Sequence, residues 1–426
     1  MSNITYDEFN EIISNNRASL LCGNGFSINF DERYKWGNLV NSLYSTHINL
    51  PYHYSFNVVS NNDYKTVVSN NFKNVMKIIK KMRTQQQFYS IFVGAVDFLH
   101  TILDNQQVME WFKMNVDHTL TFGFSISELL NNIKKQYTDN GLNGVNYEYW
   151  TILIYCVTAM KKAPEELYAF DLNNIFVKLV IDGGQLTISK SDLFTESITN
   201  GMYTYFRLLF ASNILFNGDS FHVEALQNWD KISHDKVNGF TNKFDSLMTT
   251  NYDNIMDMIT GRKVYHLHGK YSRETQRVLG MSLGMQYNAI RYDMSTITIG
   301  DYFVSKSFFQ ISAKMASKNK NNSKVQIYDD MIMEAVHINN TNVVVIFGLN
   351  IDNDYHIIRS IQERICDLYN PKIIYCYFTE TDKLSFEEVY NKCITYSDTL
   401  NQSVKNISVL YVDSKEIIDK LFVIQK

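Results

Sequence analysis

The sequence has few cysteines for its length, and their spacing excludes two classes of site. The chain of 426 residues carries 5 cysteines, at positions 22, 156, 366, 376 and 393. None of them forms the closely spaced pairs that structural zinc sites use, and an odd, scattered set is not a disulfide framework. We therefore expect free, buried thiols in a reducing compartment, and no metal is expected.

Long apolar runs, a leader sequence and clusters of basic residues are also missing. No apolar run reaches the roughly 20 residues that a membrane-spanning helix needs. The first eight residues are polar and acidic, which argues against a signal peptide. The net charge is −4, with lysine and arginine dispersed along the chain, so no dedicated nucleic-acid site is evident. We expect a soluble, cytoplasmic protein without a membrane contact.

The sequence has enough apolar residues for a large buried core. Strand-like and helix-like runs alternate along part of it. Hydrophobic residues make up 45% of the chain and aromatic residues 14%. Apolar strand-like runs occur at 18–22, 244–249, 263–267, 343–347, 372–377 and 407–411. Helical runs follow the last three, and this alternation is typical of a parallel sheet with helices on both faces. We predict an α/β fold with a Rossmann-like parallel sheet and a large, mainly helical insertion.

The apolar pattern also predicts how the domains are divided. Residues 1–62 form the first part of the Rossmann-like domain and residues 245–426 form the remainder. Between them, residues 63–244 show apolar residues at helical spacing and little strand punctuation, which predicts a helical insertion. A short strand pair is expected around residues 176–188, because Asp182-Gly183-Gly184-Gln185 fits a hairpin turn.

Four short polar motifs stand where apolar, strand-like runs end. They are Gly23-Asn24-Gly25-Phe26-Ser27, Thr250-Asn251-Tyr252-Asp253, His266-Leu267-His268-Gly269 and Gly348-Leu349-Asn350. Open parallel sheets bind ligands in the crevice beyond the carboxyl ends of their strands. Four such motifs in one chain therefore predict a ligand site at one edge of the sheet.

The first motif is typical of the start of a dinucleotide-binding turn. Gly23 permits a tight bend, and Gly25 lets backbone N–H groups approach a pyrophosphate closely. Ser27 adds a hydroxyl at the start of the following helix. The third glycine of the usual fingerprint is absent, so a glycine-rich surface turn is the alternative.

The second motif places an amide and a carboxylate at the predicted ligand crevice. Asn251 can hold a water or a ribose hydroxyl, and Asp253 can accept a hydrogen bond from ribose. The alternative is structural, because Asn and Asp at the end of a strand are also common caps of the next helix.

The third and fourth motifs add histidines and further polar residues. His266 and His268 share one face of a strand, but no cysteine or carboxylate completes a recognisable metal set around them. We interpret His266 as a core histidine and His268, at the strand end, as a general base. Asn350 and Asp354 are candidates for contacts with a nucleotide, although Asp354 also suits the positive end of a helix dipole.

The order of these motifs resembles the sirtuin-like superfamily, most closely its prokaryotic branch associated with anti-phage defence. The resemblance covers roughly residues 1–60 and 244–426. It implies NAD as the bound substrate and its cleavage to nicotinamide and ADP-ribose in abortive infection. The chain lacks the four-cysteine zinc module of sirtuin deacylases and has Ile28-Asn29-Phe30-Asp31-Glu32-Arg33 in place of their G-I-P-D-F-R stretch. Lysine deacylation is therefore disfavoured.

The resemblance assigns a role to each candidate residue. Asn251, His268 and Asp253 form the catalytic set, in which Asn251 orients a water, His268 acts as the base and Asp253 fixes Asn251 or ribose. The NAD-binding set comprises Gly23, Asn24, Gly25, Phe26, Ser27, Thr250, Gly269, Gly348, Asn350 and Asp354. Two alternatives stay open, a sensor that binds NAD or an ADP-ribose derivative without cleaving it, and an ADP-ribosyltransferase.

Control of such an activity is expected from the helical insertion. A homo-oligomer or a hetero-complex with a partner protein or a phage-derived trigger would regulate cleavage, because constitutive loss of NAD is toxic. A structural lid over the crevice is the other interpretation of the insertion.

Overall fold

The chain divides into two compact units. The computed structural model describes residues 2–50, 53–58, 62–117, 125–187, 191, 193–216, 223–270, 281–286, 297–300, 328–351, 354–395 and 404–422. The first unit comprises Met1–Lys35, Asp219–Lys270 and Gln326–Lys426, and the second comprises Trp36–Gly218 and Tyr271–Val325.

These boundaries differ from the predicted division at residues 62/63 and 244/245. Helix α3 (Trp36–Ile48) belongs to the second unit, where Ser42 and Thr46 donate hydrogen bonds to Asn213 of α11 (Gly201–Ile214). Helix α12 (His234–Thr241) belongs to the first unit. Local apolar spacing carries no information about the core on which a helix packs.

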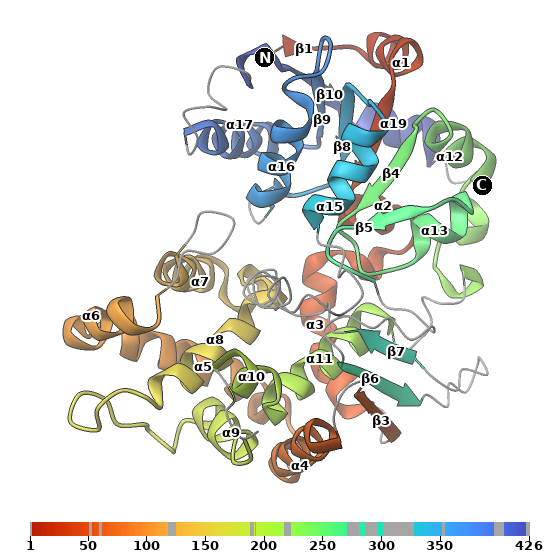
Figure 1. Ribbon diagram of the computed structural model, residues 1–426. Coiled ribbons are helices and arrows are strands. Elements are labelled where there is room, and N and C mark those ends of the chain that lie inside the picture. The colour runs from red at the N-terminus through yellow and green to blue at the C-terminus, as the bar shows by residue number, and fades with distance from the viewer. Residues whose placement is uncertain are drawn as a thin grey trace. The chain divides into compact units, whose positions relative to one another are not determined.

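The first unit is built on a seven-stranded sheet in which all neighbouring strands run parallel (Figure 1). The strand order is β1-β10-β9-β8-β2-β4-β5. The strands are β1 (Ser2–Asn3), β2 (Ala18–Cys22), β4 (Ser246–Thr249), β5 (Val264–His266), β8 (Val343–Phe347), β9 (Lys372–Tyr377) and β10 (Ser408–Asp413). The predicted α/β fold with a Rossmann-like sheet is confirmed.

The central strands are short, apolar and buried along their whole length. Every residue of β2 and of β8 is buried, as expected for parallel strands that are covered by helices on both faces. The sequence predicted the bounds of β2, β8 and β9 to the residue. It missed β1, which has only two residues and therefore no readable periodicity.

Helices cover both faces of this sheet. Those between the strands and at the end of the chain are α1 (Tyr6–Asn15), α2 (Asn24–Phe30), α12, α13 (Ile255–Thr260), α15 (Tyr328–Ile332), α16 (Tyr355–Ile365), α17 (Glu380–Thr395) and α19 (Ser414–Leu421). Helix α12 contacts α13 and α19, and its Phe240 ring lies 6.3 Å from Phe9 of α1. Helix α16 contacts α15 and α17. A π-helical turn, Met333–Ile338, leads into β8.

Strand β2 marks the point where the strand order reverses. The chain passes from β2 to β4 and β5 on one side, and later places β8, β9 and β10 on the other side. Crevices at such switch points, beyond the carboxyl ends of the strands, are the usual ligand sites of open parallel sheets.

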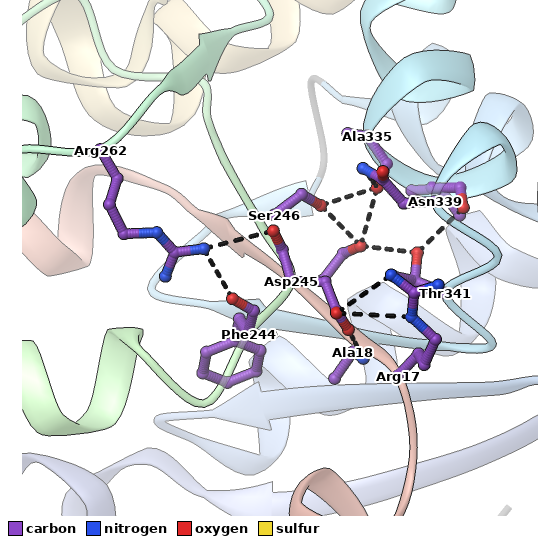
Figure 2. A network of polar contacts seen from close by, with 11 residues as sticks. Arg17, Ala18, Phe244, Asp245, Ser246, Arg262, Ala335, Asn339 and Thr341 are labelled. Atoms are coloured by element: carbon purple, nitrogen blue, oxygen red, sulfur yellow. Dashed lines mark hydrogen bonds and ion pairs between the residues drawn. The ribbon is translucent and has the colours of Figure 1, made fainter.

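A polar network ties the opposite, amino-terminal edge of the sheet together (Figure 2). Oγ of Ser246 in β4 lies within hydrogen-bond distance of Oγ of Ser19 in β2, at 2.8 Å, and of the carbonyl oxygen of Ala335 in the π-helical turn, at 2.7 Å. Ser19 also shares a hydrogen bond of 2.7 Å with Thr341. Asp245 accepts from the guanidinium of Arg17 and from the backbone N–H of Ala18. Because the buried hydroxyls of Ser19, Ser246 and Thr341 all have partners, the network fixes β2, β4 and the start of β8 relative to one another.

The second unit is mainly helical and also contains a three-stranded antiparallel sheet. The sheet has the order β3-β6-β7, with β3 (His53–Val58), β6 (Met281–Gln286) and β7 (Ile297–Gly300). Besides α3 and α11, the helices are α4 (Asn62–Ile79), α5 (Gln85–Leu103), α6 (Gln106–Asn115), α7 (Ile126–Asn140), α8 (Tyr147–Met160), α9 (Ile175–Gly183) and α10 (Leu193–Ile198). Helix α11 is buried over nearly its whole length and forms the centre of the unit.

The hairpin predicted at residues 176–188 is wrong, because its first half is helix α9. Asn174 caps the helix by accepting hydrogen bonds from the backbone N–H groups of Phe176 and Val177. The buried residues Phe176, Val177, Leu179 and Val180 follow a helical period, and the Gly183-Gly184 pair ends the helix instead of turning a hairpin.

The cysteines and the apolar content of the helices follow from the composition. All five cysteines are free and buried. Burial raises the pKa of the Cys22 thiol well above its ordinary value, so this thiol is protonated and inert at neutral pH. Across the described ranges, no helix has both the length and the apolar content needed to cross a bilayer.

Candidate functional site

The four predicted motifs lie together in the first unit, at the carboxyl ends of four adjacent strands. Strands β8, β2, β4 and β5 are consecutive in the sheet, and each leads directly into one of the motifs. The sequence predicted the strand ends, and the order of the strands brings those ends together.

The glycines of the loop after β2 pack against the glycine turn after β8. The backbone N–H of Gly23 donates to the carbonyl oxygen of Phe347 at 2.9 Å, and that of Gly25 donates to the carbonyl oxygen of Gly348 at 2.7 Å. A Cβ atom on Gly25 would lie 2.7 Å from the Cα of Gly348, and one on Gly23 would lie 2.5 Å from the Cα of Leu349. The turn itself needs a glycine, because Gly348 has φ +64°. These two donors therefore face the Gly348 turn.

Two other residues of the loop use their side chains inside the protein. The amide of Asn24 donates to the carbonyl oxygen of Tyr34 at 2.7 Å. Phe26 is buried, with its ring 5.5 Å from that of Phe30 and 5.8 Å from that of Phe422. Both side chains hold the loop in place.

Asn251, Ser27 and Asp253 form one directed chain of hydrogen bonds. Nδ2 of Asn251 donates to the carbonyl oxygen of Gly23 at 3.1 Å and to Oγ of Ser27 at 2.9 Å. Oγ of Ser27 in turn donates to Oδ2 of Asp253 at 2.8 Å. The carbonyl of Gly23 only accepts, so it fixes which end of the amide carries the hydrogens. Both amide hydrogens are engaged, and the amide offers Oδ1 as an acceptor to a ligand or water.

Asp253 is the last acceptor in this series of hydrogen bonds and is almost completely buried. Burial raises the pKa of its carboxyl group, and this shift is opposed by hydrogen bonds from the N–H of Ile255 and from Ser27 and by the charge of His266. The backbone N–H of Ile255, the first residue of α13, donates to Oδ1 of Asp253 at 3.0 Å, although the N-cap residue of this helix is Asn254 and not the predicted Asn251 or Asp253. Asp253 acts on the site through Ser27.

His266 is a fully partnered core histidine, as its sequence context suggested. Its Nδ1 lies 3.0 Å from the carbonyl oxygen of Asn251, and its Nε2 lies 2.7 Å from Oδ2 of Asp257. Lys270 donates to the other oxygen of Asp257 at 3.0 Å. Burial would raise the pKa of Asp257, but the hydrogen bond from His266, its charge and Lys270 together lower it. This arrangement holds the backbone of Asn251 in position.

His268 points toward Asp354. The side chain of His268 is only 7% exposed, and its Nε2 lies 3.3 Å from Oδ1 of Asp354. The two groups lack the alignment of a hydrogen bond, and within the described part of the chain Nε2 has no hydrogen-bond partner. Gly269 follows with φ +83° and donates its N–H to the carbonyl oxygen of His266, a tight turn that sets the direction of His268.

Sequence reasoning missed a third member of this group, His356. One ligand atom from each of His268, Asp354 and His356 lies within 4.8 Å of the others. The rings of His268 and His356 stack with centroids 5.7 Å apart, and Tyr328 packs edge-on against His356 at 4.7 Å. The available signal was the Asp-x-His spacing at the start of the helix after β8, which gains meaning only beside His268.

The remaining predicted residues lie at the same edge of the sheet. Thr250 is nearly buried, and its backbone N–H donates to the carbonyl oxygen of Cys22 at 3.1 Å. Asn350 is exposed beyond the Gly348 turn. Tyr252, which was not among the predicted contacts, brings its ring to 6.2 Å from His268.

Comparison of the chain with protein-family models, curated proteins and solved structures found no match. The residues of the site supply a fixed amide acceptor at Asn251, an imidazole beside a carboxylate at His268 and Asp354, and backbone at the ends of β2 and β8. Such a set can orient a water or hydroxyl and remove a proton from it.

Proposed function

We propose that this chain is an NAD glycohydrolase that cleaves NAD to nicotinamide and ADP-ribose and serves as an abortive-infection effector against phage. The observation that carries the proposal is the chain from Asn251 through Ser27 to Asp253, at the same sheet edge as His268 and Asp354. This edge lies at the switch point of a parallel sheet, where nucleotides are usually bound.

The reaction replaces one bond at the nicotinamide ribose. The glycosidic bond breaks with its electron pair going to the nicotinamide nitrogen, a water oxygen bonds to the anomeric carbon, and the water loses a proton. Such cleavages pass through an oxocarbenium-like ribose. The site therefore has to hold the ribose, place one water and accept one proton.

Each requirement has a residue suited to it. Oδ1 of Asn251 accepts a hydrogen bond from the water or a ribose hydroxyl, and its direction is fixed by the bonds to Gly23 and Ser27. His268 accepts the proton. Asp354, 3.3 Å away, stabilises the imidazolium that results.

Binding of NAD along the loop backbones belongs to the same proposal. The segment from Gly23 to Ser27 lines the sheet edge with Thr250, Gly269, Gly348 and Asn350, and the dinucleotide would lie across them. Control by oligomerisation, a partner protein or a phage-derived trigger is proposed for the second unit, because unregulated NAD loss would kill the host cell.

The test is release of nicotinamide from NAD by the purified full-length chain, followed by chromatography. Wild type should release nicotinamide, and His268→Gln should lower the rate by roughly two to four orders of magnitude, the usual contribution of a positioned base. His337→Gln is the matched control, since this exposed histidine precedes β8 at the opposite edge.

The same assay separates the alternatives. A sensor would bind NAD without releasing nicotinamide, and a transferase would leave ADP-ribose attached to an acceptor. If wild type and His268→Gln released nicotinamide at the same rate, the assignment of His268 would be wrong. If purified wild type were inactive, repeating the assay in phage-infected cells would show whether an activator is needed, and inactivity there too would reject the glycohydrolase.

A further inference from the structure

We infer that His268, Asp354 and His356 form a binding site for a divalent transition-metal ion of the zinc class, and that the bound ion holds the proposed NAD-cleaving site inactive. The second half of this inference rests on the proposed function, and the first half does not.

The donor set is the first argument. Two imidazoles and one carboxylate, with one ligand atom of each within 4.8 Å of the others, match the three protein ligands of open zinc sites. Metal–ligand bonds of about 2.1 Å at tetrahedral angles place neighbouring ligand atoms about 3.4 Å apart. Nε2 of His268 and Oδ1 of Asp354 are 3.3 Å apart, so these two atoms already have the separation of two ligands of one ion.

The orientation of His268 and Asp354 is the second, independent argument. Nε2 of His268 is buried and has no hydrogen-bond partner in the described ranges, although a carboxylate oxygen lies close to it. A close pair of a nitrogen and a carboxylate oxygen that makes no hydrogen bond is the arrangement expected of two ligands of one ion. A buried imidazole nitrogen without a partner is otherwise costly.

Asp354 departs from the usual behaviour of a residue at its position. It occupies the N-cap of α16, where an aspartate ordinarily accepts a hydrogen bond from the first turn of the helix. Its side chain makes no such capping bond and lies instead beside His268. The first turn of α16 then supplies His356, so one helix start delivers two of the three ligands.

The surroundings suit a site for a softer divalent ion. Imidazole nitrogens favour zinc, iron, cobalt or nickel over calcium and magnesium, which prefer oxygen ligands. Tyr328 packs edge-on against His356 at 4.7 Å, and both Asp354 and His356 are nearly buried. A fourth position would be filled by water or by an oxygen of a ligand.

Metal binding and base catalysis by His268 exclude each other. An imidazole bonded to a metal through one nitrogen carries its remaining proton on the other nitrogen, so neither nitrogen can accept a proton at neutral pH. Zinc at this site would therefore remove the proposed base, and release of zinc would restore it.

Binding is tested first, by a readout that needs no NAD. The full-length chain is freed of metal with a chelator and titrated with Co²⁺, whose visible absorption identifies four-coordinate sites, and with Zn²⁺ by calorimetry. Wild type and His337→Gln should bind one ion per chain at this site. His356→Gln should weaken binding by more than the roughly 10- to 100-fold that loss of an outer-shell partner costs.

A second variant guards against a folding defect. His356→Phe keeps an aromatic ring against His268 and Tyr328 but cannot ligate, so it should stay folded and lose the ion. Zn²⁺ should raise the melting temperature of wild type and not that of His356→Phe. No four-coordinate Co²⁺ spectrum in wild type, or equal binding by folded His356 variants, would overturn the site.

The inhibitory role is tested by nicotinamide release in chelator and in excess Zn²⁺. Nicotinamide release by wild type should be slower in zinc than in chelator. Release by His356→Phe should have the same rate in zinc and in chelator. A rate that rises with zinc, or inhibition that is equal in both proteins, would overturn inhibition through this site. If no protein cleaved NAD, either purified or in phage-infected cells, the proposed function would fail, while the Co²⁺ titration would still decide the metal site.

Discussion

Gly25 donates its backbone N–H to the carbonyl oxygen of Gly348 at 2.7 Å, so the loops that follow two neighbouring strands touch backbone to backbone. Each glycine leaves room for the other, since a Cβ on Gly348 would lie 2.8 Å from the Cα of Gly25. The contact joins the loops that follow β2 and β8 at the candidate site. It explains this pair of glycines by packing, whatever ligand lies above them.

The first prediction concerns this contact. Gly25→Ala places a Cβ 2.7 Å from the Cα of Gly348, and backbone atoms cannot move aside as a flexible side chain can. We expect the free energy of unfolding to fall by about 1–3 kcal/mol, the usual cost of overpacking. Denaturation in urea measures the change.

Gly239→Ala is the matched control. Gly239 lies in α12 of the same unit, and an added Cβ would meet nothing within 4 Å. Alanine there should stabilise the helix by up to about 1 kcal/mol. Equal midpoints for the two variants would show that the Gly25–Gly348 contact does not limit stability.

The second prediction concerns the amide of Asn251. Asn251→Ala removes the proposed water acceptor and should lower nicotinamide release by roughly two to four orders of magnitude. Asn342→Ala makes the same change at the amino end of β8, where Asn342 donates to Asn16 and to the carbonyl oxygen of Tyr369. Asn342→Ala should cleave NAD at the wild-type rate. Near-normal cleavage by Asn251→Ala would remove Asn251 from the mechanism.

The third prediction uses the raised pKa of Asp253. Because burial places the folded-state pKa above that of the unfolded chain, the stability that this group contributes is full below pH about 4. It is then lost as the pH rises through the folded-state pKa. The free energy of unfolding of wild type minus that of Asp253→Asn should therefore fall as the pH is raised from about 4 to neutrality. Urea titrations at several pH values measure this difference.

Asp257 supplies a comparison of opposite sign. Its folded-state pKa is lowered, because the hydrogen bond from His266 and the nearby Lys270 outweigh burial. The stability it contributes is present above pH about 4 and is lost as the pH falls through the lowered value. The difference between wild type and Asp257→Asn should shrink below that pH. A flat profile for both variants would contradict the assigned shifts.

The fourth prediction separates stability from activity. Arg262 donates to the carbonyl oxygen of Thr241 at 2.9 Å. It also donates to the carbonyl oxygen of Phe244 at 2.8 Å, at the amino-terminal edge of the sheet (Figure 2). Arg262→Lys keeps the charge but cannot reach both acceptors, so we expect a loss of about 1–2 kcal/mol in stability. Nicotinamide release by the folded fraction should not change.

Arg17→Lys is the control for this change. Arg17 pairs with Asp245 at 3.2 Å, but its side chain is 57% exposed, and exposed ion pairs contribute about 1 kcal/mol or less. Thermal denaturation should therefore show a smaller shift for Arg17→Lys than for Arg262→Lys. The reverse order would mean that the exposed pair matters more than the bonds made by Arg262.

The sequence by itself determined the class of fold and the position of the site along the chain. Runs such as 343–347 are wholly apolar and are followed by a glycine, a pattern typical of buried parallel strands that end in a turn. The polar residues that follow such runs are consequently at the ligand edge of the sheet. This reasoning located Ser27, Asn251 and His268 without coordinates.

The tertiary structure alone decided which of these residues meet. It paired Gly25 with Gly348, linked Asn251 to Asp253 through Ser27, and added His356 to His268 and Asp354. It also showed that Ile175–Gly183 forms a helix where a hairpin was expected, and that α3 belongs to the second unit. Local periodicity reports only which face of an element is buried, whereas partners distant in the chain are chosen by strand order and packing.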